Sequence, residues 1–205
     1  MDAVAELGAA ARGIAMIGRD TSFDALNALH AGGIRGIRLH LLIGKLHTWD
    51  DVPAMAAQVQ HLGWHIELQM DGRDLAEREA LLAALPGQVV IDHIGKFREP
   101  VAPDHPSFRA LLRLVERGNC WVKISGAYET SKSGPPDYAD VAPLAHTLVA
   151  AAPERMVWAS NWPHPSAHGA RPDDATLMQT LLTWMGDAAT RRRILVDNPA
   201  TLYGF

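Results

Sequence analysis

Six short apolar runs recur along the chain, each bounded by glycine, proline or polar residues. They span residues 13–18, 35–42, 64–70, 88–95, 120–126 and 155–161. Runs of this length predict β-strands. The stretches between and after them space apolar residues three and four positions apart, which predicts helices. These helices cover residues 22–31, 50–62, 74–84, 106–118, 140–151, 174–186, about 187–195 and 198–203.

Three of the predicted helices start at residues whose side chains suit a helix N-terminus. Ser22 precedes the first helix, and Asp50 opens the second. Asp74, with Glu77 three positions later, resembles a capping box. Such side chains accept hydrogen bonds from backbone N–H groups that the first turn leaves without partners. The sequence therefore predicts helix starts at these three places.

Strands and helices alternate, which indicates an α/β fold with a parallel sheet. Two architectures compete: a doubly wound open sheet, and a (β/α)₈ barrel of the TIM type. No Gly-x-Gly-x-x-Gly follows any predicted strand, so the dinucleotide fingerprint of the first architecture is missing.

The polarity of the strands favours the barrel. One parity is apolar, as at Ile37 and Leu39, and suits packing beneath helices. The other parity is polar in several strands, and a barrel lumen that opens onto a site provides a place for it. A structural polar network without catalysis is the alternative. The polar positions are Arg38, His40, His65, Glu67, Gln69, Lys123, Ser125 and Asn161.

The bulk composition limits the partners and the compartment. The chain has 205 residues, 48% of them hydrophobic, and a net charge of −4, which argues against nucleic acid and anionic membranes as partners. No apolar window of about 18 residues predicts a membrane span, and the first residues lack the pattern of a secretory signal. The lone Cys120 lies in an apolar run, which suggests a buried thiol in a reducing, cytoplasmic compartment.

Four motifs carry a resemblance to a known family. They are VVIDHIG at 89–95, WVKISGAYETS at 121–131, MVWASNWPHP at 156–165 and VDNPATLYGF at 196–205. In this order and spacing they resemble the amidohydrolase-related (amidohydrolase 2) family, and within it the 2-pyrone-4,6-dicarboxylate lactonase-like hydrolases. The resemblance implies a distorted (β/α)₈ barrel that hydrolyses a small cyclic ester (a lactone) or a related carbonyl compound by adding water. Some wider relatives are decarboxylases.

The family's first strand carries a His-x-His pair, and none lies near this N-terminus. If 155–161 forms strand eight, counting back makes 13–18 strand three. We therefore expect residues 1–205 to form a single, N-terminally incomplete domain that lacks the first two βα units. The two open sheet edges of such a barrel would invite pairing with a second copy, so we expect a homo-oligomer.

The resemblance implies two catalytic positions. His93 matches the family histidine near the substrate carbonyl, which binds metal in metal-dependent members. Asn161 stands where the family pattern Trp-Gly-(Ser/Thr)-Asp-Trp-Pro-His has the aspartate that activates water. An amide cannot take a proton from water, and general-base catalysis is worth roughly 10²–10⁴-fold. We therefore expect impaired hydrolysis.

The remaining candidates concern substrate binding. Arg38 stands where family members hold a substrate carboxylate, and Lys45 offers a second cation. Glu129 aligns with an arginine of the dicarboxylate lactonase, which argues against a dicarboxylate here. The further candidates are Gln69, Tyr128, Ser131 and His164. The expected ligand is a small organic acid or lactone.

We expect no metal in this chain because too few ligands remain, although the intact family site can hold a divalent ion such as zinc. Two other functions stay open. One is a non-catalytic relative that keeps the scaffold for ligand binding or assembly, since a fold alone does not establish function. The other is a decarboxylase of the same family.

Overall fold

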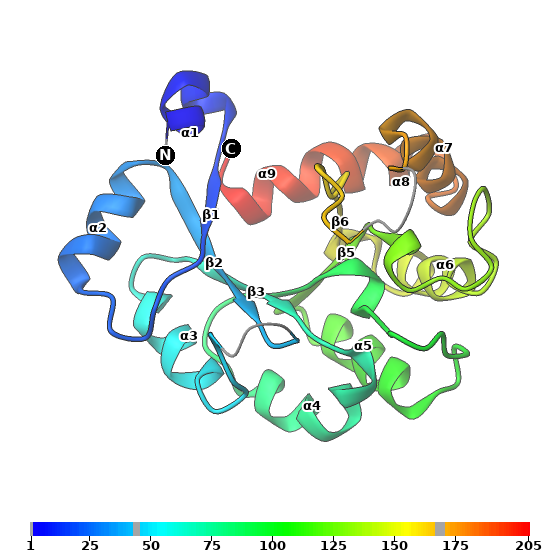
Figure 1. Cartoon of the computed structure of the whole chain (residues 1–205), viewed down its shortest axis with the longest axis horizontal. Coiled ribbons are helices and arrows are strands. Elements are labelled where there is room, and N and C mark those ends of the chain that lie inside the picture. Colours follow the sequence, from blue (N-terminus) through cyan, green and yellow to red (C-terminus); the bar gives the residue numbers. More distant parts are fainter. Residues whose placement is uncertain (1, 43–45, 167–170) are drawn as a thin grey trace.

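The computed structural model describes residues 2–42, 46–166 and 171–205, and within them the strands form one parallel sheet. All six predicted strands are present, and they follow one another across the sheet in chain order. A doubly wound sheet reverses its strand order at a switch point, whereas a barrel winds in one direction. The sheet curls into a half-barrel (Figure 1). The strands are β1 (Gly13–Ala15), β2 (Ile34–His40), β3 (His65–Gln69), β4 (Val89–Ile91), β5 (Cys120–Ile124) and β6 (Met156–Trp158).

Helices follow the strands at the predicted places. They are α1 (Asp2–Leu7), α2 (Phe23–Ala31), α3 (Val52–Gln60), α4 (Leu75–Ala83), α5 (Pro106–Glu116), α6 (Ala142–Ala151), α7 (Asp174–Trp184), α8 (Ala188–Arg192) and α9 (Asn198–Tyr203). A π-helical turn joins α8 to α9. The sequence did not predict α1. Within the described ranges, no helix combines the length and apolarity needed to cross a membrane.

The predicted helix starts have different outcomes. Ser22 is confirmed, because its hydroxyl accepts a hydrogen bond from the backbone N–H of Ala25. The capping box at Asp74 is wrong, since its side chain makes no cap hydrogen bond. Asp71 instead accepts from the N–H of Arg73 and starts a 3₁₀ turn ahead of α4. The N-cap of α3 is Asp51 and not the predicted Asp50. The Asp51 carboxylate accepts a hydrogen bond from the backbone N–H of Thr48 and none from the first turn of the helix.

The two faces of the sheet differ as the alternation predicts. The apolar parity, such as Ile37 and Leu68, is fully buried beneath helices α2 to α6 on the outer face (Figure 1). Burying each such side chain contributes about 1.5–3 kcal/mol. Cys120 is buried as expected, and burial raises the pKa of its thiol to about 12. The inner face carries the polar parity together with a small apolar cluster.

The C-terminal segment lies across the open side of the half-barrel (Figure 1). At one end the Asn198 amide donates to backbone carbonyls of Pro153 and Met156, beside β6. At the other end Arg12, just before β1, donates to the Gly204 carbonyl at 2.8 Å. The segment therefore links the sides of the two edge strands, β1 and β6. Pairing of these edges with a second copy stays a prediction.

Candidate active site

The turns after β4, β5 and β6 meet at the C-terminal rim of the sheet, and their backbone is unusual. His93, Lys96, Asn161 and His164 all have φ between 47° and 65°, in the left-handed region. Non-glycine residues there cost on the order of 1–3 kcal/mol each and concentrate at functional sites. The chain thus maintains a strained backbone where β4 and β6 end.

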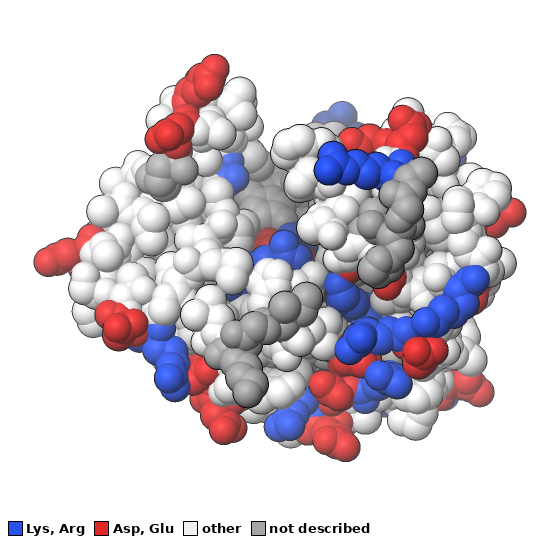
Figure 2. Space-filling model, in the orientation of Figure 1, with Lys and Arg blue, Asp and Glu red and all other residues white. Residues whose placement is uncertain are grey.

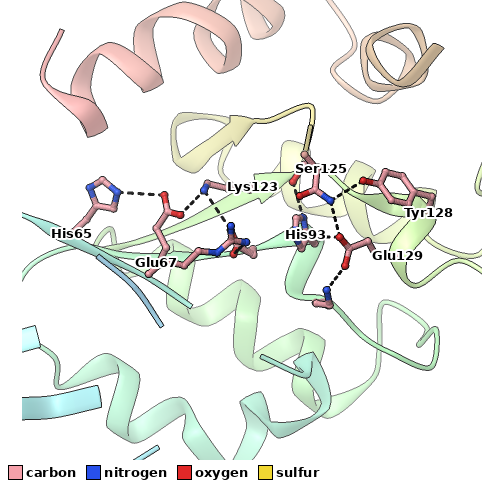
Figure 3. A network of polar contacts seen from close by, with 11 residues as sticks. His65, Glu67, His93, Lys123, Ser125, Tyr128 and Glu129 are labelled. Atoms are coloured by element: carbon pink, nitrogen blue, oxygen red, sulfur yellow. Dashed lines mark hydrogen bonds and ion pairs between the residues drawn. The ribbon is translucent and has the colours of Figure 1, made fainter. Parts of the chain in front are cut away.

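His93 is buried, and its two ring nitrogens have different surroundings (Figure 3). Nδ1 lies 3.0 Å from the Ser125 hydroxyl. Nε2 has no hydrogen-bond partner among the described residues, and its nearest carboxylate oxygen is Oε1 of Glu129 at 3.8 Å. Burial lowers the pKa of His93 although Asp92 and Glu129 oppose that effect. The ring is therefore neutral near pH 7, and when Ser125 donates to Nδ1 the proton resides on Nε2.

Gly126 makes room for this histidine. Its φ of 61° is left-handed, and a Cβ at this position would lie 2.6 Å from Nδ1 of His93. A side chain at residue 126 would therefore force the imidazole away from Ser125.

Asn161 is held by two acceptors at the same rim. Its Nδ2 donates to Oε1 of Glu129 at 2.6 Å and to the Tyr128 hydroxyl at 2.7 Å. An amide nitrogen carries two hydrogens, so both are used and the carbonyl oxygen is left to accept from a ligand.

Glu129 is almost fully buried, with 2% of its side chain exposed, and Lys96 binds its second oxygen. Burial raises the pKa of Glu129, but the Lys96 ammonium and the hydrogen bonds from Lys96 and Asn161 oppose that effect, and the pKa lies below its ordinary value. The carboxylate is therefore ionised near neutral pH. We call His93, Ser125, Tyr128, Glu129 and Asn161 the rim cluster.

Tyr128 and His164 extend the rim cluster outward. The Tyr128 hydroxyl lies 2.9 Å from Nδ1 of His164, whose Nε2 lies 3.2 Å from the carboxylate of Asp174 on α7. Burial raises the pKa of Tyr128 to about 12. Tyr128 therefore holds the Asn161 amide, and His164 in turn holds the Tyr128 hydroxyl.

A second set of side chains crosses the inner face below the rim. Asp92 pairs with Arg38 and lies 3.4 Å from Nζ of Lys123. Lys123 in turn donates to Glu67 at 2.6 Å. Burial disfavours the charge on Lys123, but attraction from its two carboxylates outweighs this and raises its pKa. We call His65, Glu67, Lys123, Asp92 and Arg38 the inner charged row.

A cavity of about 270 Å³ joins the two sets. It brings together three residues that the sequence singled out, Arg38, His93 and Asn161. Figure 2 shows the hollow on this face, with basic side chains inside it. The full lining is Arg38, Asp92, His93, Lys123, Ala159, Ser160, Asn161 and Trp162.

The other predicted binding residues that the structure describes do not line this cavity. Tyr128 and Ser131 line two neighbouring cavities, of about 570 and 780 Å³. The Ser131 hydroxyl donates to Asp140 at 2.5 Å, so it also holds its own loop. Gln69 is buried at the end of β3, opposite His40. Lys45 lies outside the described residues.

The residues present do not fit a metal ion. Among the side chains that the structure describes, no three His, Cys, Asp or Glu residues converge as a ligand set. The carboxylate nearest His93 is Glu129, and its oxygens already accept from Lys96 and Asn161. A cation there would meet the lysine ammonium at close range, so we derive no step through a metal.

Sequence reasoning missed the roles of Glu129 and Lys96. Glu129 stood out only as a replacement for an arginine, and Lys96 carried no signal. Glu129 contacts both Lys96 and Asn161 and so joins three separate turns, and no spacing within one motif encodes this arrangement.

Comparison with known proteins now identifies the family. The family model described as amidohydrolase matches residues 1–205. The chain belongs to the amidohydrolase 2 family. The resemblance given by the motifs is thus confirmed.

Three relatives place the chain within that family. It is 39% identical over 202 residues to D-galactarolactone isomerase of Agrobacterium fabrum, covering 98% of this chain and 69% of that protein. It is 32% identical over 213 residues to 2-pyrone-4,6-dicarboxylate hydrolase of Comamonas testosteroni, covering 99% and 70%. A crystal structure of a probable 2-pyrone-4,6-dicarboxylic acid hydrolase from Acinetobacter baumannii, with citric acid bound, superposes with a TM-score of 0.85 at 26% identity, covering 100% and 77%.

Proposed function

We propose that this amidohydrolase-family protein opens the ester bond of a small lactone or a related carbonyl compound. The observation that carries the proposal is the buried Nε2 of His93, which has no partner among the described residues and borders a cavity with two cations. An N–H at this point donates to the oxygen that becomes negative when a carbonyl is attacked. One such donor is worth about 2.7–4 kcal/mol in the transition state. Relatives named for lactones support the assignment.

The substrate we propose is a small organic acid in lactone form. A cavity of about 270 Å³ is slightly below the usual range for drug-sized ligands, which suits a compact ring. Arg38 borders it and keeps donors beyond the nitrogen that Asp92 accepts from, so it retains hydrogens for one substrate carboxylate. The citric acid bound to the Acinetobacter baumannii relative supports this ligand class.

The strand assignment is part of the proposal. We propose that β1 to β6 correspond to strands three to eight of an eight-stranded barrel, with residues 1–205 as one domain. The sequential strand order and the full coverage of this chain by the Acinetobacter baumannii structure support it.

Asn161 bears on which nucleophile attacks. Water is a weak nucleophile without a base, and an amide supplies none. A hydroxyl of the substrate itself is held close to the carbonyl, and well-oriented intramolecular attack reaches effective molarities of about 10⁵–10⁸ M. We therefore propose that ring isomerisation outruns hydrolysis. The hydroxyl oxygen adds to the carbonyl carbon, the original ring C–O bond breaks, and the hydroxyl proton ends on the departing oxygen.

The test is turnover of a panel of hydroxylated lactone acids in ¹⁸O-labelled water. The proposal expects a lactone with a different ring and no ¹⁸O, whereas hydrolysis gives a hydroxy acid that carries one ¹⁸O. His93→Gln is the control and should lose either reaction. Ligand binding without turnover of any lactone would overturn the proposal in favour of a non-catalytic relative, and release of carbon dioxide would indicate a decarboxylase.

A further inference from the structure

We infer that Glu129 would keep a carboxyl group at position 161 protonated, so that this site suits an amide there, and that residues 129 and 161 together select the nucleophile at the proposed lactone site. The inference rests on the proposed function for its consequence, but its electrostatic basis stands on the rim cluster alone. Glu129 acts through Asn161, so it is a positioning residue rather than a catalytic one.

The contact that carries the inference is short and buried. Oε1 of Glu129 lies 2.6 Å from Nδ2 of Asn161, and 2% of the Glu129 side chain is exposed. An amide suits this place because its N–H donates to the carboxylate. An aspartate would instead set two carboxylate oxygens at the same separation, with little water between them.

The surrounding charges do not compensate for a second carboxylate. Lys96 binds the other oxygen of Glu129, and the His93 ring 3.8 Å away is neutral because burial lowers its pKa. Tyr128, which also faces residue 161, is neutral as well, since its pKa is raised to about 12. Arg38 and Lys123 border the cavity, but their charge is engaged by Asp92 and Glu67.

Two carboxylates that share one cation in a buried site bind one proton between them. The pair then titrates with one lowered and one strongly raised pKa. A carboxyl group that keeps its proton at pH 7 cannot accept another from water. Asn161→Asp by itself should therefore fail to create a base, although the side chain matches the family pattern.

Replacing Glu129 with a neutral residue should lower the raised pKa of a carboxyl group at position 161. In the double variant Asn161→Asp with Glu129→Gln, the amide introduced at position 129 can donate to the carboxylate introduced at position 161, and Lys96 remains nearby as a cation. The new carboxyl group should then ionise below neutral pH and activate water at the carbonyl. The choice between isomerisation and hydrolysis would thus depend on two residues together.

The experiment compares the wild-type chain, both single variants and the double variant in ¹⁸O-labelled water. At pH 7 we expect the double variant to hydrolyse at least tenfold faster than either single variant. The Asn161→Asp variant should gain hydrolysis only as pH rises above the raised pKa of the pair. Glu99→Gln in the Asn161→Asp background is the matched control, since Glu99 is an exposed carboxylate of the neighbouring loop, and it should give no gain.

A second readout does not need turnover. In ¹³C-carboxyl NMR, the Asn161→Asp variant should show a carboxyl group that titrates above pH 6, and Glu129→Gln should remove that titration. Should Asn161→Asp unfold at pH 7, recovery of folding in the double variant would support the inference, and unfolding of both would contradict it.

The results separate the inference from the proposed function. Asn161→Asp hydrolysing as fast as the double variant at pH 7, or titrating below pH 5 with Glu129 in place, would overturn the inference. Absence of lactone turnover in every variant would remove the proposed function, and the titration alone would then decide the inference.

Discussion

The inner charged row and the rim cluster lie side by side on one sheet, yet they satisfy their polar groups differently. In the row, Arg38, Asp92, Lys123 and Glu67 follow one another as opposite charges within 3.5 Å, and Nε2 of His65 lies 3.5 Å from Glu67. Four row atoms still make no hydrogen bond among the described residues: Nε of Arg38, Oδ1 of Asp92, Oε1 of Glu67 and Nε2 of His65. In the rim cluster, Nε2 of His93 has no hydrogen bond among the described residues, and its nearest carboxylate oxygen, Oε1 of Glu129, is farther away at 3.8 Å. Four of the five row residues lie on strands and Asp92 directly follows β4, whereas the cluster lies on the turns after β4, β5 and β6, where His93 and Asn161 have left-handed backbone.

This difference indicates that the inner charged row mainly stabilises the fold and that the rim cluster is available for chemistry. Paired charges on neighbouring strands fix the strands to one another, and within the row we assign a ligand contact to Arg38 alone. A left-handed turn that places a histidine with an unpartnered nitrogen beside a cavity is costly for folding, and such turns concentrate at functional sites. We therefore assign a structural role to the row, apart from the substrate contact proposed for Arg38, and a catalytic role to the cluster.

The largest expected effect is on folding, from Lys123→Met. Removing this ammonium leaves Glu67 and Asp92 buried without their shared cation, and breaking a buried pair in this way costs about 3–5 kcal/mol. The free energy of unfolding from urea titration measures it. Lys132→Met is the control, because Lys132 pairs with Glu99 on the surface and should leave stability near that of the wild type. Equal stabilities of the two variants would remove the distinction between row and cluster.

The next effect is on catalysis, from His93→Gln. Losing the oxyanion donor should lower kcat/KM for a reactive lactone by roughly 10²–10³-fold. Folding should be little affected, since the polar side chain keeps a similar size. A loss below about threefold would place the chemistry elsewhere in the molecule.

The pH dependence of the same residue gives a separate test. Burial lowers the folded pKa of His93 below its ordinary 6.5. The neutral ring therefore contributes activity and stability that are fully present above pH 6.5 and are lost as pH falls through the lowered folded value. A pH–rate profile should show its acidic limb below 6.5, and an acidic limb above 7 would contradict the assignment.

A smaller effect is expected from Gly126→Ala. The methyl group would lie 2.6 Å from Nδ1 of His93 and should turn the ring, lowering kcat/KM roughly tenfold, which corresponds to about 1.4 kcal/mol. Gly63→Ala is the matched control, because Gly63 has a similar φ of 67° and open space around it. It should lose stability alone, and an equal loss of activity in both variants would show that backbone strain, not the clash, is responsible.

The smallest effect is expected from Ser125→Ala. It removes the hydroxyl 3.0 Å from Nδ1 of His93, and a hydrogen bond of this kind is worth about 0.5–1.5 kcal/mol. Turnover should fall severalfold with KM nearly unchanged, because the Ser125 hydroxyl orients the His93 ring and Ser125 does not line the cavity of about 270 Å³. Ser125→Thr keeps the hydroxyl and should recover part of the rate.

The strands and their polarity were predictable because burial imposes a period of two on any strand with one apolar face. The alternation of apolar Ile37 and Leu39 with charged Arg38 was enough to assign the first two to the outer, helix-covered face of the sheet and Arg38 to the inner face. His93 and Asn161 followed from motifs that each lie within one short segment. The prediction of a capping box at Asp74 was wrong because Asp71 caps a 3₁₀ turn that already includes Asp74.

The partners within the site were not predictable from the sequence. Lys96, Glu129 and Asn161 leave three different strands, and their contact depends on left-handed turns that no local pattern encodes. Arg38 illustrates the same limit. Its position at the cavity followed from the resemblance, whereas its pairing with Asp92 depends on the neighbouring turn.

A crystal structure of the chain with citrate, or with a slowly reacting lactone acid, tests the central claim most directly. We predict a ligand oxygen within hydrogen-bond distance of Nε2 of His93, a carboxylate on Arg38, and the carbonyl of Asn161 facing a ligand hydroxyl. A ligand seated instead in the 570 Å³ cavity between Tyr138 and α7, with the space beside His93 unused, would contradict the account.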